Sequence, residues 1–489
     1  MKHMKKLAAV LVSVLMSFAM MTTVFAEGTT YKLTLNGTTE GHTYEAYQIF
    51  TGDLSTEGEK KVLSNVEWGT GVTYTGTESA AAIAKALGDN TMSLAQLEEK
   101  LTLTKAVKTV TSSSGKTVID GLAAGYYLVK DKDGTQSGTE DAYTKFIVQV
   151  VGDTEAKIKS DVPTVVKKVM DANDSEGTTS DWQDSADYDI GDDVPYQVTG
   201  SMPDNIADYT TYKYVFTDTM SKGLTFKEGS TKIMIGTKDV TDSFKENVNT
   251  GTDGTTVTWA CDNLKGIDDV TLDANTKVVV TYTATLNKNA VIGAAGNPNT
   301  VNLTYSNNPN NGGEGETGKT PDDKNIVFTY KVVVNKVDQD KKSLKGAAFK
   351  LEKKQSDGTY KEIKSFTADD KTTTFEFTGL DDGDYKLTET TTPAGYNTIT
   401  PIEFTISAKH ATASDDPQLT ELSGNVTSGE ATFAGDTKTG SLTTDVVNKK
   451  GSTLPSTGGI GTTMFYVAGG LMVVVAGVLL AAKKKAEAK

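Results

Sequence analysis

The sequence predicts a mainly β protein made of three tandem immunoglobulin-like β-sandwich modules, with a hydrophobic segment at each end of the chain. Short alternating runs of Val, Tyr, Phe and Thr recur along the 489 residues, and Gly, Asp and Asn separate them, as in sheets joined by many turns. The single cysteine, Cys261, excludes an intramolecular disulfide and is expected to be a small core residue. The formal net charge of −15 argues against nucleic acid as a partner.

The N-terminal 26 residues have the form of a secretory signal peptide. Lysines at positions 2, 5 and 6 precede an apolar stretch over residues 7–21. Val24 and Ala26 then supply the small residues that a signal-peptide cleavage site requires. We therefore expect a secreted mature chain that begins near Glu27.

The C-terminal segment, residues 451–489, contains a short motif followed by a membrane-spanning helix. Residues 464–482 are apolar, and about 19 residues in a helix reach roughly 28 Å, enough to cross a bilayer. The lysines at positions 483–485 would hold this end on the cytoplasmic side. An ordinary C-terminal anchor would have the same helix, but here it follows the pentapeptide Leu454, Pro455, Ser456, Thr457 and Gly458.

This order of motif, apolar stretch and basic tail resembles the LPxTG cell-wall sorting signal of Gram-positive surface proteins. The resemblance implies that a sortase cleaves between Thr457 and Gly458 and transfers the threonine carbonyl to an amine. The precursor would then be held in the membrane only transiently, before attachment to the cell wall.

The first module, residues 27–161, is predicted to be mixed but mainly β. Alternating residues predict strands over 31–35, 125–129 and 146–151. Two short helices are expected over 79–87 and 93–101, and Ser93 with Gln96 has the form of a capping box.

The second module covers residues 162–325 and the third covers residues 326–450, and both read as series of short strands. Residues 306–325 are rich in Asn, Gly, Asp and Pro, so we expect a linker or a long surface loop there. Strands are predicted at 165–169, 195–199, 213–217, 257–259, 278–286 and 301–305, and then at 327–337, 348–352, 374–377, 385–388, 402–406 and 444–447. Three β modules in series are typical of an extended protein, not of a compact enzyme.

Three patterns that could indicate a ligand site or an active site lack the required context. Residues 313–320 fit the P-loop and GxGxxG patterns, but no strand and helix flank them, and Glu314 and Glu316 would repel phosphate. The histidines, at positions 3, 42 and 410, are too few to suggest a metal site or a Ser-His-Asp hydrolase. An aspartate cluster lacks EF-hand spacing and is expected to be a solvated loop: Asp181, Asp184, Asp187, Asp189, Asp192 and Asp193. We expect no metal, no cofactor and no enzymatic activity on other molecules.

A lysine, an acid and an asparagine share the inward face of predicted strands in the second and third modules. Lys167 alternates with Val165 and Val169, so its side chain points towards the core, where an unpaired ammonium is costly. The same parity holds for Asp218 and Asn299 in the second module and for Lys336, Glu389 and Asn448 in the third.

These three groups can react with one another. Burial lowers the pKa of a lysine and raises that of a carboxylic acid, so the amine becomes a nucleophile and the acid can carry a proton. Attack on the asparagine amide expels ammonia and leaves a Lys–Asn isopeptide bond, with the fold supplying the proximity. The alternative is that the lysines are solvated at the edges of strands.

The third module resembles a collagen-adhesin B-type domain. The resemblance rests on residues 336–338, 344–351, 385–390 and 393–396. It implies a crosslink between Lys336 and Asn448, with Glu389 as the autocatalytic acid.

The second module resembles the isopeptide-forming middle domain of backbone pilins, through residues 161–169, 212–220 and 297–309. The resemblance implies a crosslink between Lys167 and Asn299, with Asp218 as the acid. The competing residues are Lys168, Asn297 and Asn302; strand parity prefers Lys167 but permits either Asn297 or Asn299.

The whole chain resembles the shaft subunit of sortase-assembled pili. That family carries a polymerisation lysine in a YPKN-like motif at the end of its first domain, and Lys159 is the best match, with Lys157 second. The tyrosine and the proline of that motif are missing from residues 155–160. In the first module Asp131 has the place of a crosslink acid, but no lysine and asparagine accompany it.

The resemblance implies a structural role in a covalent, wall-anchored pilus that supports adhesion. The implied partners are sortase, other copies of the chain, peptidoglycan, tip or minor pilins and host surface ligands. The alternative is a monomeric LPxTG-anchored adhesin that binds a host or matrix ligand directly.

Overall fold

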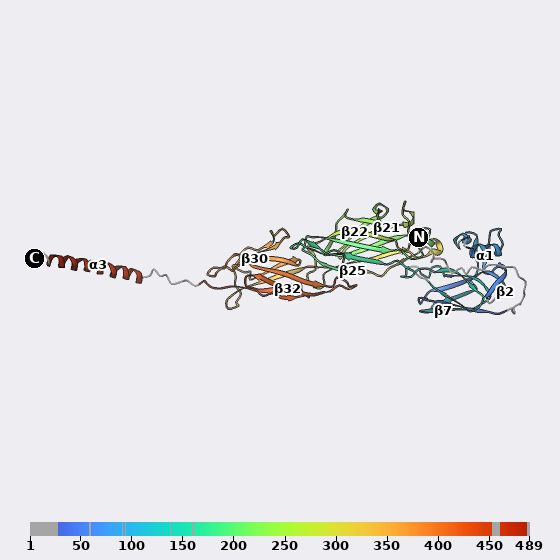
Figure 1. Ribbon diagram of the computed structural model, residues 1–489, viewed down its shortest axis with the longest axis horizontal. Coiled ribbons are helices and arrows are strands. Elements are labelled where there is room, and N and C mark those ends of the chain that lie inside the picture. Colours follow the sequence, from blue (N-terminus) through green and yellow to red (C-terminus); the bar gives the residue numbers. More distant parts are fainter. Residues whose placement is uncertain are drawn as a thin grey trace.

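The computed structural model describes residues 28–57, 60–89, 91–92, 94–136, 138–158, 161–451 and 460–486. The predicted mainly β fold class is confirmed. Three β domains follow one another along an extended molecule, and the helix α3 (Ile460–Ala486) lies at one end of it (Figure 1).

The first domain packs a small sheet and two helices against opposite faces of a larger sheet. Tyr127 and Val129 join the core between the two sheets, whereas Leu128 faces the core beneath the helices. The small sheet has the order β10 (Thr154–Lys157), β1 (Tyr31–Asn36), β7 (Lys116–Leu122). The large sheet has the order β3 (Lys60–Trp68), β2 (Thr43–Glu57), β8 (Gly125–Asp131), β9 (Lys145–Val150), with β6 (Lys108–Thr111) paired to β2.

The helices of this domain are α1 (Ala80–Gly88) and α2 (Leu94–Glu98). The Ser79 hydroxyl caps α1 by accepting a hydrogen bond from the Ala82 N–H. The helix predicted over 93–101 is shorter than expected, because residues 101–103 form β5 (Leu101–Leu103), which pairs with β4 (Val72–Tyr74). Ser93 lies outside the described residues, so its predicted capping box is not described.

The second domain is a sandwich of two large sheets around one continuous core, and Cys261 is buried in that core, as predicted. One sheet has the order β11 (Val165–Val169), β15 (Asp193–Ser201), β22 (Lys277–Leu286), β18 (Lys232–Ile235), β19 (Lys238–Asp239), with β17 (Leu224–Phe226) paired to β22. The other has the order β14 (Ser185–Asp187), β25 (Asp323–Phe328), β23 (Asn297–Ser306), β16 (Tyr214–Ser221), β21 (Gly254–Cys261), β20 (Lys245–Thr250), with β24 (Thr317–Lys319) paired to β23.

Smaller elements complete this domain. The strands β12 (Ala172–Asn173) and β13 (Thr178–Thr179) form a separate ribbon. Four single-turn 3₁₀ helices, in the described part of the chain, are η1 (Ile206–Asp208), η2 (Thr241–Ser243), η3 (Leu264–Gly266) and η4 (Pro309–Asn311).

Residues 306–325 are not the linker or surface loop that their composition predicts. They form η4 and β24, and they dock on the first domain. The buried Asn307 side chain donates to the backbone carbonyls of Gln136, at 2.7 Å, and Asp141, at 3.0 Å. The Tyr143 N–H donates back to the Asn307 carbonyl at 2.8 Å. The asparagine side chain here binds backbone groups across the joint between two domains. Composition alone cannot distinguish such a docked segment from a flexible one.

The third domain is a smaller sandwich of two sheets. Its first and last strands, β26 and β34, are neighbours and run parallel. One sheet has the order β29 (Thr374–Leu380), β26 (Tyr330–Asp338), β34 (Ser441–Asn448), β33 (Ala434–Asp436). The other has the order β28 (Tyr360–Ser365), β27 (Ala348–Lys354), β30 (Gly383–Thr391), β31 (Ile402–His410), β32 (Leu419–Ser428).

The second and third domains are joined by a single residue. The strand β25 ends at Phe328 and β26 begins at Tyr330, so only Thr329 lies between them. Thr329 is fully buried, and its hydroxyl donates to the Leu380 carbonyl at 3.2 Å. The chain therefore passes from one core to the next without a flexible connection.

Candidate crosslink sites

The core of the second domain encloses a lysine, an acid and an asparagine. Lys167 is on β11 of one sheet, whereas Asp218 on β16 and Asn299 on β23 belong to the facing sheet. None of the three has any exposed surface. The Lys167 ammonium donates to Asp218 Oδ2 and, at 2.7 Å, to the Tyr282 hydroxyl.

Burial perturbs both ionisable groups of this set. Removal from water lowers the pKa of Lys167, although the charge of Asp218 opposes the shift. Removal from water also raises the pKa of Asp218, against the effect of Lys167. Both shifts favour a neutral amine beside a protonated acid, which is the state in which the amine is a nucleophile.

Tyr282 connects the amine of Lys167 to the amide of Asn299, and the sequence patterns did not indicate it. Its hydroxyl accepts from Asn299 Nδ2 at 2.8 Å and donates to Asp218 Oδ2 at 3.0 Å. The ammonium also lies over two rings, 4.9 Å from the centre of Tyr196 and 5.0 Å from that of Tyr282. The alternation of Tyr282 with Val278 and Val280 could have indicated an inward hydroxyl that needs a polar partner.

The competing residues of this domain are engaged elsewhere. Lys168 points to the other face of β11 and pairs with Asp184. Asn297 is buried, but its amide binds the backbone of Val291 and Val327, with its Nδ2 at 3.1 Å from each carbonyl oxygen. Asn302 faces outward and donates to Asp322 at 2.9 Å. The geometry brings together Lys167, Asp218 and Asn299, and it leaves the alternatives apart from them.

The third domain contains a second enclosed set with a different layout. Lys336 and Asn448 have no exposed surface, and the Glu389 side chain between them has none either. Glu389 Oε2 accepts from Asn448 Nδ2 at 3.0 Å, and Glu389 Oε1 lies 3.9 Å from Lys336 Nζ. The carboxyl group therefore spans the amine and the amide nitrogen.

The amine of this set is held by the neighbouring strand. Lys336 Nζ donates to the Val446 carbonyl at 2.8 Å. Burial lowers the pKa of Lys336 to about 8, although the charge of Glu389 opposes this. The amide carbonyl oxygens of Asn448 and of Asn299 are both buried and lack a hydrogen-bond partner among the described residues. Each of these oxygens can accept a hydrogen bond.

A third fully buried lysine, Lys353, shows why burial alone does not make a nucleophile. Its ammonium lies 2.8 Å from Asp189, 3.1 Å from Asp381 and 3.4 Å from Asp174. Burial lowers the pKa of Lys353, but three carboxylates outweigh burial and raise it. Lys353 thus stays charged, and its ion pairs connect the second and third domains.

In its described residues, the first domain contains a buried histidine–aspartate ion pair and not the buried lysine, acid and asparagine of the other two domains. The carboxylate of Asp131 is fully buried and lies 2.8 Å from His42 Nδ1. Asp141 lies 3.3 Å from the other ring nitrogen. Burial lowers the pKa of His42, but hydrogen bonds to the two aspartates raise it to about 9. No buried asparagine faces Asp131 among the described residues.

The predicted sites for polymerisation lie mainly outside the described residues. Neither Lys159 nor the motif Leu454, Pro455, Ser456, Thr457 and Gly458 is described. Lys157 is exposed near the end of β10, which lies beside β1. The helix α3 includes a stretch, Val467–Lys484, that is long and apolar enough to cross a membrane.

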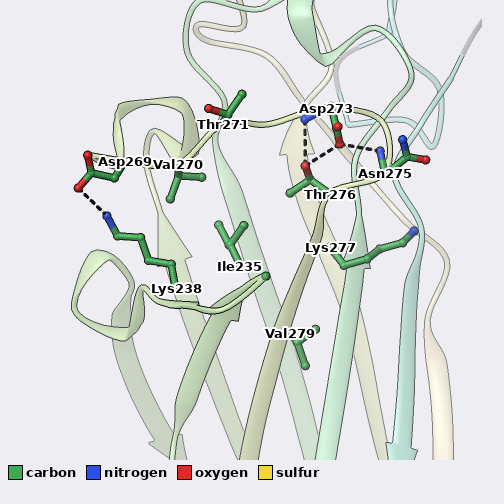
Figure 2. Close-up of a pocket in the computed structure, with 11 residues that line it drawn as sticks. Ile235, Lys238, Asp269, Val270, Thr271, Asp273, Asn275, Thr276, Lys277 and Val279 are labelled. Carbon is green, nitrogen blue, oxygen red and sulfur yellow. Dashed lines mark hydrogen bonds and ion pairs between the residues drawn. The ribbon is translucent and has the colours of Figure 1, made fainter. Parts of the chain in front are cut away.

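The sandwich surface also has an open depression of about 500 Å³ in the second domain (Figure 2). Its rim holds an ion pair between Lys238 and Asp269 and a turn in which Asp273 accepts hydrogen bonds from Asn275 and Thr276. The Asp273 carboxylate is therefore already bound within its own turn. The segment 313–320 forms a turn and β24 with no helix after it, which removes the context of a nucleotide site.

Comparison with known protein families assigns three parts of the chain. Residues 190–309 match the family described as Gram-positive pilin backbone subunit 2, Cna-B-like domain. Residues 330–417 match a prealbumin-like fold domain, and residues 446–489 match the LPXTG cell wall anchor motif.

Comparison with individual proteins finds similarity over nearly the whole chain. The trypsin-resistant surface T6 protein of Streptococcus pyogenes serotype M6 is 25% identical, over 94% of this chain and 95% of that protein. The structure of the T6 backbone pilin has a TM-score of 0.53 at 20% identity, over 87% of this chain and 100% of its own. The major pilin SpaD of Corynebacterium diphtheriae has a TM-score of 0.50 at 18% identity, over 87% and 99%.

Proposed function

We infer that this chain, a pilus backbone subunit with an LPXTG cell-wall anchor, works as a mechanical link that is covalently closed within itself and to its neighbours. Its role is structural. The finer proposal has two parts, which are internal Lys–Asn bonds formed by the chain alone and polymerisation through a sortase.

The internal bond of the third domain would form between Lys336 Nζ and Asn448 Cγ. The neutral amine attacks the amide carbon, and Glu389 passes a proton from the amine to Asn448 Nδ2, which leaves as ammonia. The carboxyl group is suited to this transfer because one of its oxygens faces the amine and the other contacts the leaving nitrogen, at 3.9 and 3.0 Å. The geometry is held by packing, so proximity replaces an external enzyme.

The internal bond of the second domain would form between Lys167 Nζ and Asn299 Cγ. Asp218 takes the proton from the amine, and the Tyr282 hydroxyl relays a proton to Asn299 Nδ2, so that ammonia again leaves. Tyr282 contacts all three groups, at 2.7 Å from Lys167, 3.0 Å from Asp218 and 2.8 Å from Asn299. In the second and third domains the same observation carries the proposal: a buried lysine faces an acid and a buried amide whose carbonyl oxygen is unpaired.

The experiment that tests the internal bonds is an intact mass measurement on the mature chain under denaturing conditions. The mass should fall short of the sequence mass by one ammonia per bond, two in all. Fragments from protease digestion should include two branched peptides that join residues 167 and 299, and 336 and 448. An unshifted mass would exclude both bonds.

Polymerisation is proposed to join Thr457 of one subunit to Lys159 of another, or to Lys157. A sortase would cleave after Thr457, and the lysine amine would take up the acyl group. The last subunit would be transferred to peptidoglycan, and tip or minor pilins and host ligands would engage the completed fibre.

Cell-wall extracts on a denaturing gel test this second part. A ladder of high-mass species is expected from the wild-type chain, and it should collapse in Lys159→Ala but persist in Lys157→Ala. The reverse result would move the polymerisation site to Lys157. A single band in the wild type would support instead a monomeric surface adhesin with the same internal bonds.

A further inference from the structure

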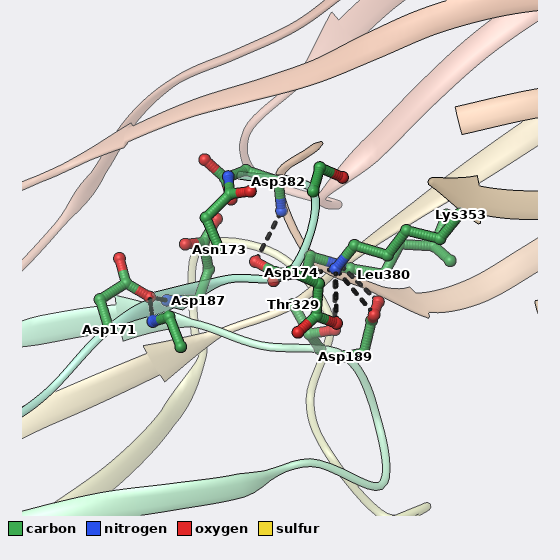
Figure 3. Close-up of polar contacts among 12 residues, drawn as sticks. Asp171, Asn173, Asp174, Asp187, Asp189, Thr329, Lys353, Leu380 and Asp382 are labelled. Carbon is green, nitrogen blue, oxygen red and sulfur yellow. Dashed lines mark hydrogen bonds and ion pairs between the residues drawn. The ribbon is translucent and has the colours of Figure 1, made fainter. Parts of the chain in front are cut away.

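The joint between the second and third domains buries more aspartate side chains than there are nearby cations to balance their negative charge. Figure 3 shows Asp174 and Asp189 at the ammonium of Lys353, with Asp187 and Asp382 further from it. Asp187 and Asp189 come from the second domain, and Asp381 and Asp382 come from the turn before β30 in the third. Asp187 is 2% exposed and Asp381 is 1% exposed.

Two cations face this cluster within the described part of the joint. Lys353 binds Asp174, Asp189 and Asp381, so its charge is already shared among three carboxylates. The His410 ring lies 3.6 Å from Asp187 and 3.9 Å from Asp171. Asp382 binds the neutral amide of Asn173 at 2.8 Å, so it gains no charge from that contact.

Three of these carboxylates converge on one point. One oxygen each of Asp187, Asp381 and Asp382 lies within 4.8 Å of the other two. Oxygen ligands of Ca²⁺ lie about 2.4 Å from the ion, so oxygens on opposite sides of it are separated by at most about 4.8 Å. The convergence therefore has the dimensions of a calcium coordination sphere.

One buried carboxylate oxygen beside this point is unpaired. Asp187 Oδ2 has no hydrogen-bond partner among the described residues. The Tyr330 hydroxyl, which has no exposed surface, lies beside Asp187. An unpaired buried carboxylate oxygen is costly and calls for a cation or a proton.

We propose that Asp187, Asp381 and Asp382 bind a calcium ion that locks the third domain to the second. The donors are all oxygens, which suits a hard cation and not a transition metal. The chain is displayed on the cell surface, where extracellular modules bind Ca²⁺ at millimolar concentrations. The ion would neutralise the charge that Lys353 and His410 leave over, and it would join β14 to the turn before β30.

Thermal unfolding of the mature chain tests this site, with millimolar CaCl₂ against EDTA. Calcium should raise the Tm of the joined domains by about 3 °C or more when its concentration is tenfold above Kd. Tb³⁺ should bind in place of Ca²⁺ and give emission excited through tyrosine, because Tyr330 lies beside the site.

The variant Asp187→Asn should lose both responses. The half-buried Asp382→Asn is the second variant, in case Asp187→Asn does not fold. Asp384→Asn is the matched control, because Asp384 lies two residues further along and binds Lys354 and Thr405 outside the cluster. It should keep both the Tm shift and the emission.

The proposal would be overturned if CaCl₂ left the Tm of the wild-type chain unchanged and added Tb³⁺ gave no tyrosine-excited emission, while the Tm rose as the pH fell from about 7 to 5. The aspartates would then hold protons instead of calcium. Responses of equal size in Asp187→Asn and in the wild type would likewise place the ion elsewhere.

Discussion

Lys336 and Asn448 lie on the first and last strands of the third domain, on the same face of two adjacent parallel strands. Lys336 is in register with Val446, and Asn448 is two residues further along. A bond between the two side chains would therefore fasten the entry of the domain directly to its exit. Tension applied at both ends would pass through that bond, and the rest of the domain would bear little of it.

Lys336→Ala should remove one ammonia loss from the intact mass and lower the stability of the third domain. By analogy with disulfide closure of a loop of about 100 residues, the loss is about 5 kcal/mol. Mass spectrometry and thermal unfolding of the mature chain measure the two effects. Lys331→Ala, on the outward face of the same strand, is the control and should keep the ammonia loss.

Tyr282→Phe should slow the formation of the bond in the second domain. The variant keeps the ring beneath Lys167 but removes the hydroxyl that contacts the amine, the acid and the amide. Mass spectrometry after short expression times should show a larger fraction without that bond. Tyr196→Phe is the control, because its ring stacks on Tyr282 at 5.2 Å but its hydroxyl makes no hydrogen bond to Lys167 or Asp218 among the described residues. Equal fractions in the two variants would exclude the relay.

The ion pair of His42 should make the first domain less stable as the pH rises. The folded-state pKa of His42 is about 9, above the unfolded value of 6.5. The protonated ring therefore stabilises the fold fully below pH 6.5, and this contribution is lost as the pH rises from 6.5 to 9. Calorimetry of the wild type and of His42→Gln at pH 6, 7.5 and 9, roughly the ends and middle of this window, should show a Tm difference that shrinks with pH. A constant difference would mean that the ring is neutral in the fold.

Lys353→Met should weaken the joint between the second and third domains. The variant leaves the carboxylates of Asp189 and Asp381 buried without their cation, and loss of one partner of a buried ion pair costs about 3–5 kcal/mol. A lower Tm and faster proteolysis near Thr329 are expected. Lys354→Met is the matched control: its ion pair with Asp384 is about 40% exposed on each side, so little change is expected.

Strand parity predicted the inward lysines because the period of a β-strand is two and both residues lie among valines. The asparagine of the second domain stayed open in the sequence because Asn297 and Asn299 share that parity. Only the fold shows that Asn297 is occupied by the backbone of Val291 and Val327. The boundaries of the modules and the bonds themselves remain predictions.

Two features could not be read from local patterns. Lys353 shares the inward parity of Phe349 and Leu351, but its acid partners Asp174 and Asp189 come from the other domain. Asp184, Asp187 and Asp189 were expected to lie in a solvated loop, because their spacing does not fit an EF-hand loop. They are buried instead, and that burial depends on the contact between two domains. The expectation for residues 306–325 was wrong because a segment whose asparagines are buried has the same composition as a flexible segment.

Thr329 alone separates the two cores, and it is itself enclosed. The second and third domains are thus expected to move as one rigid body. A filament built from such subunits would then bend at other points along its length. The distance between successive subunits would then stay nearly constant under bending, so that whatever the fibre carries on its surface keeps a regular spacing.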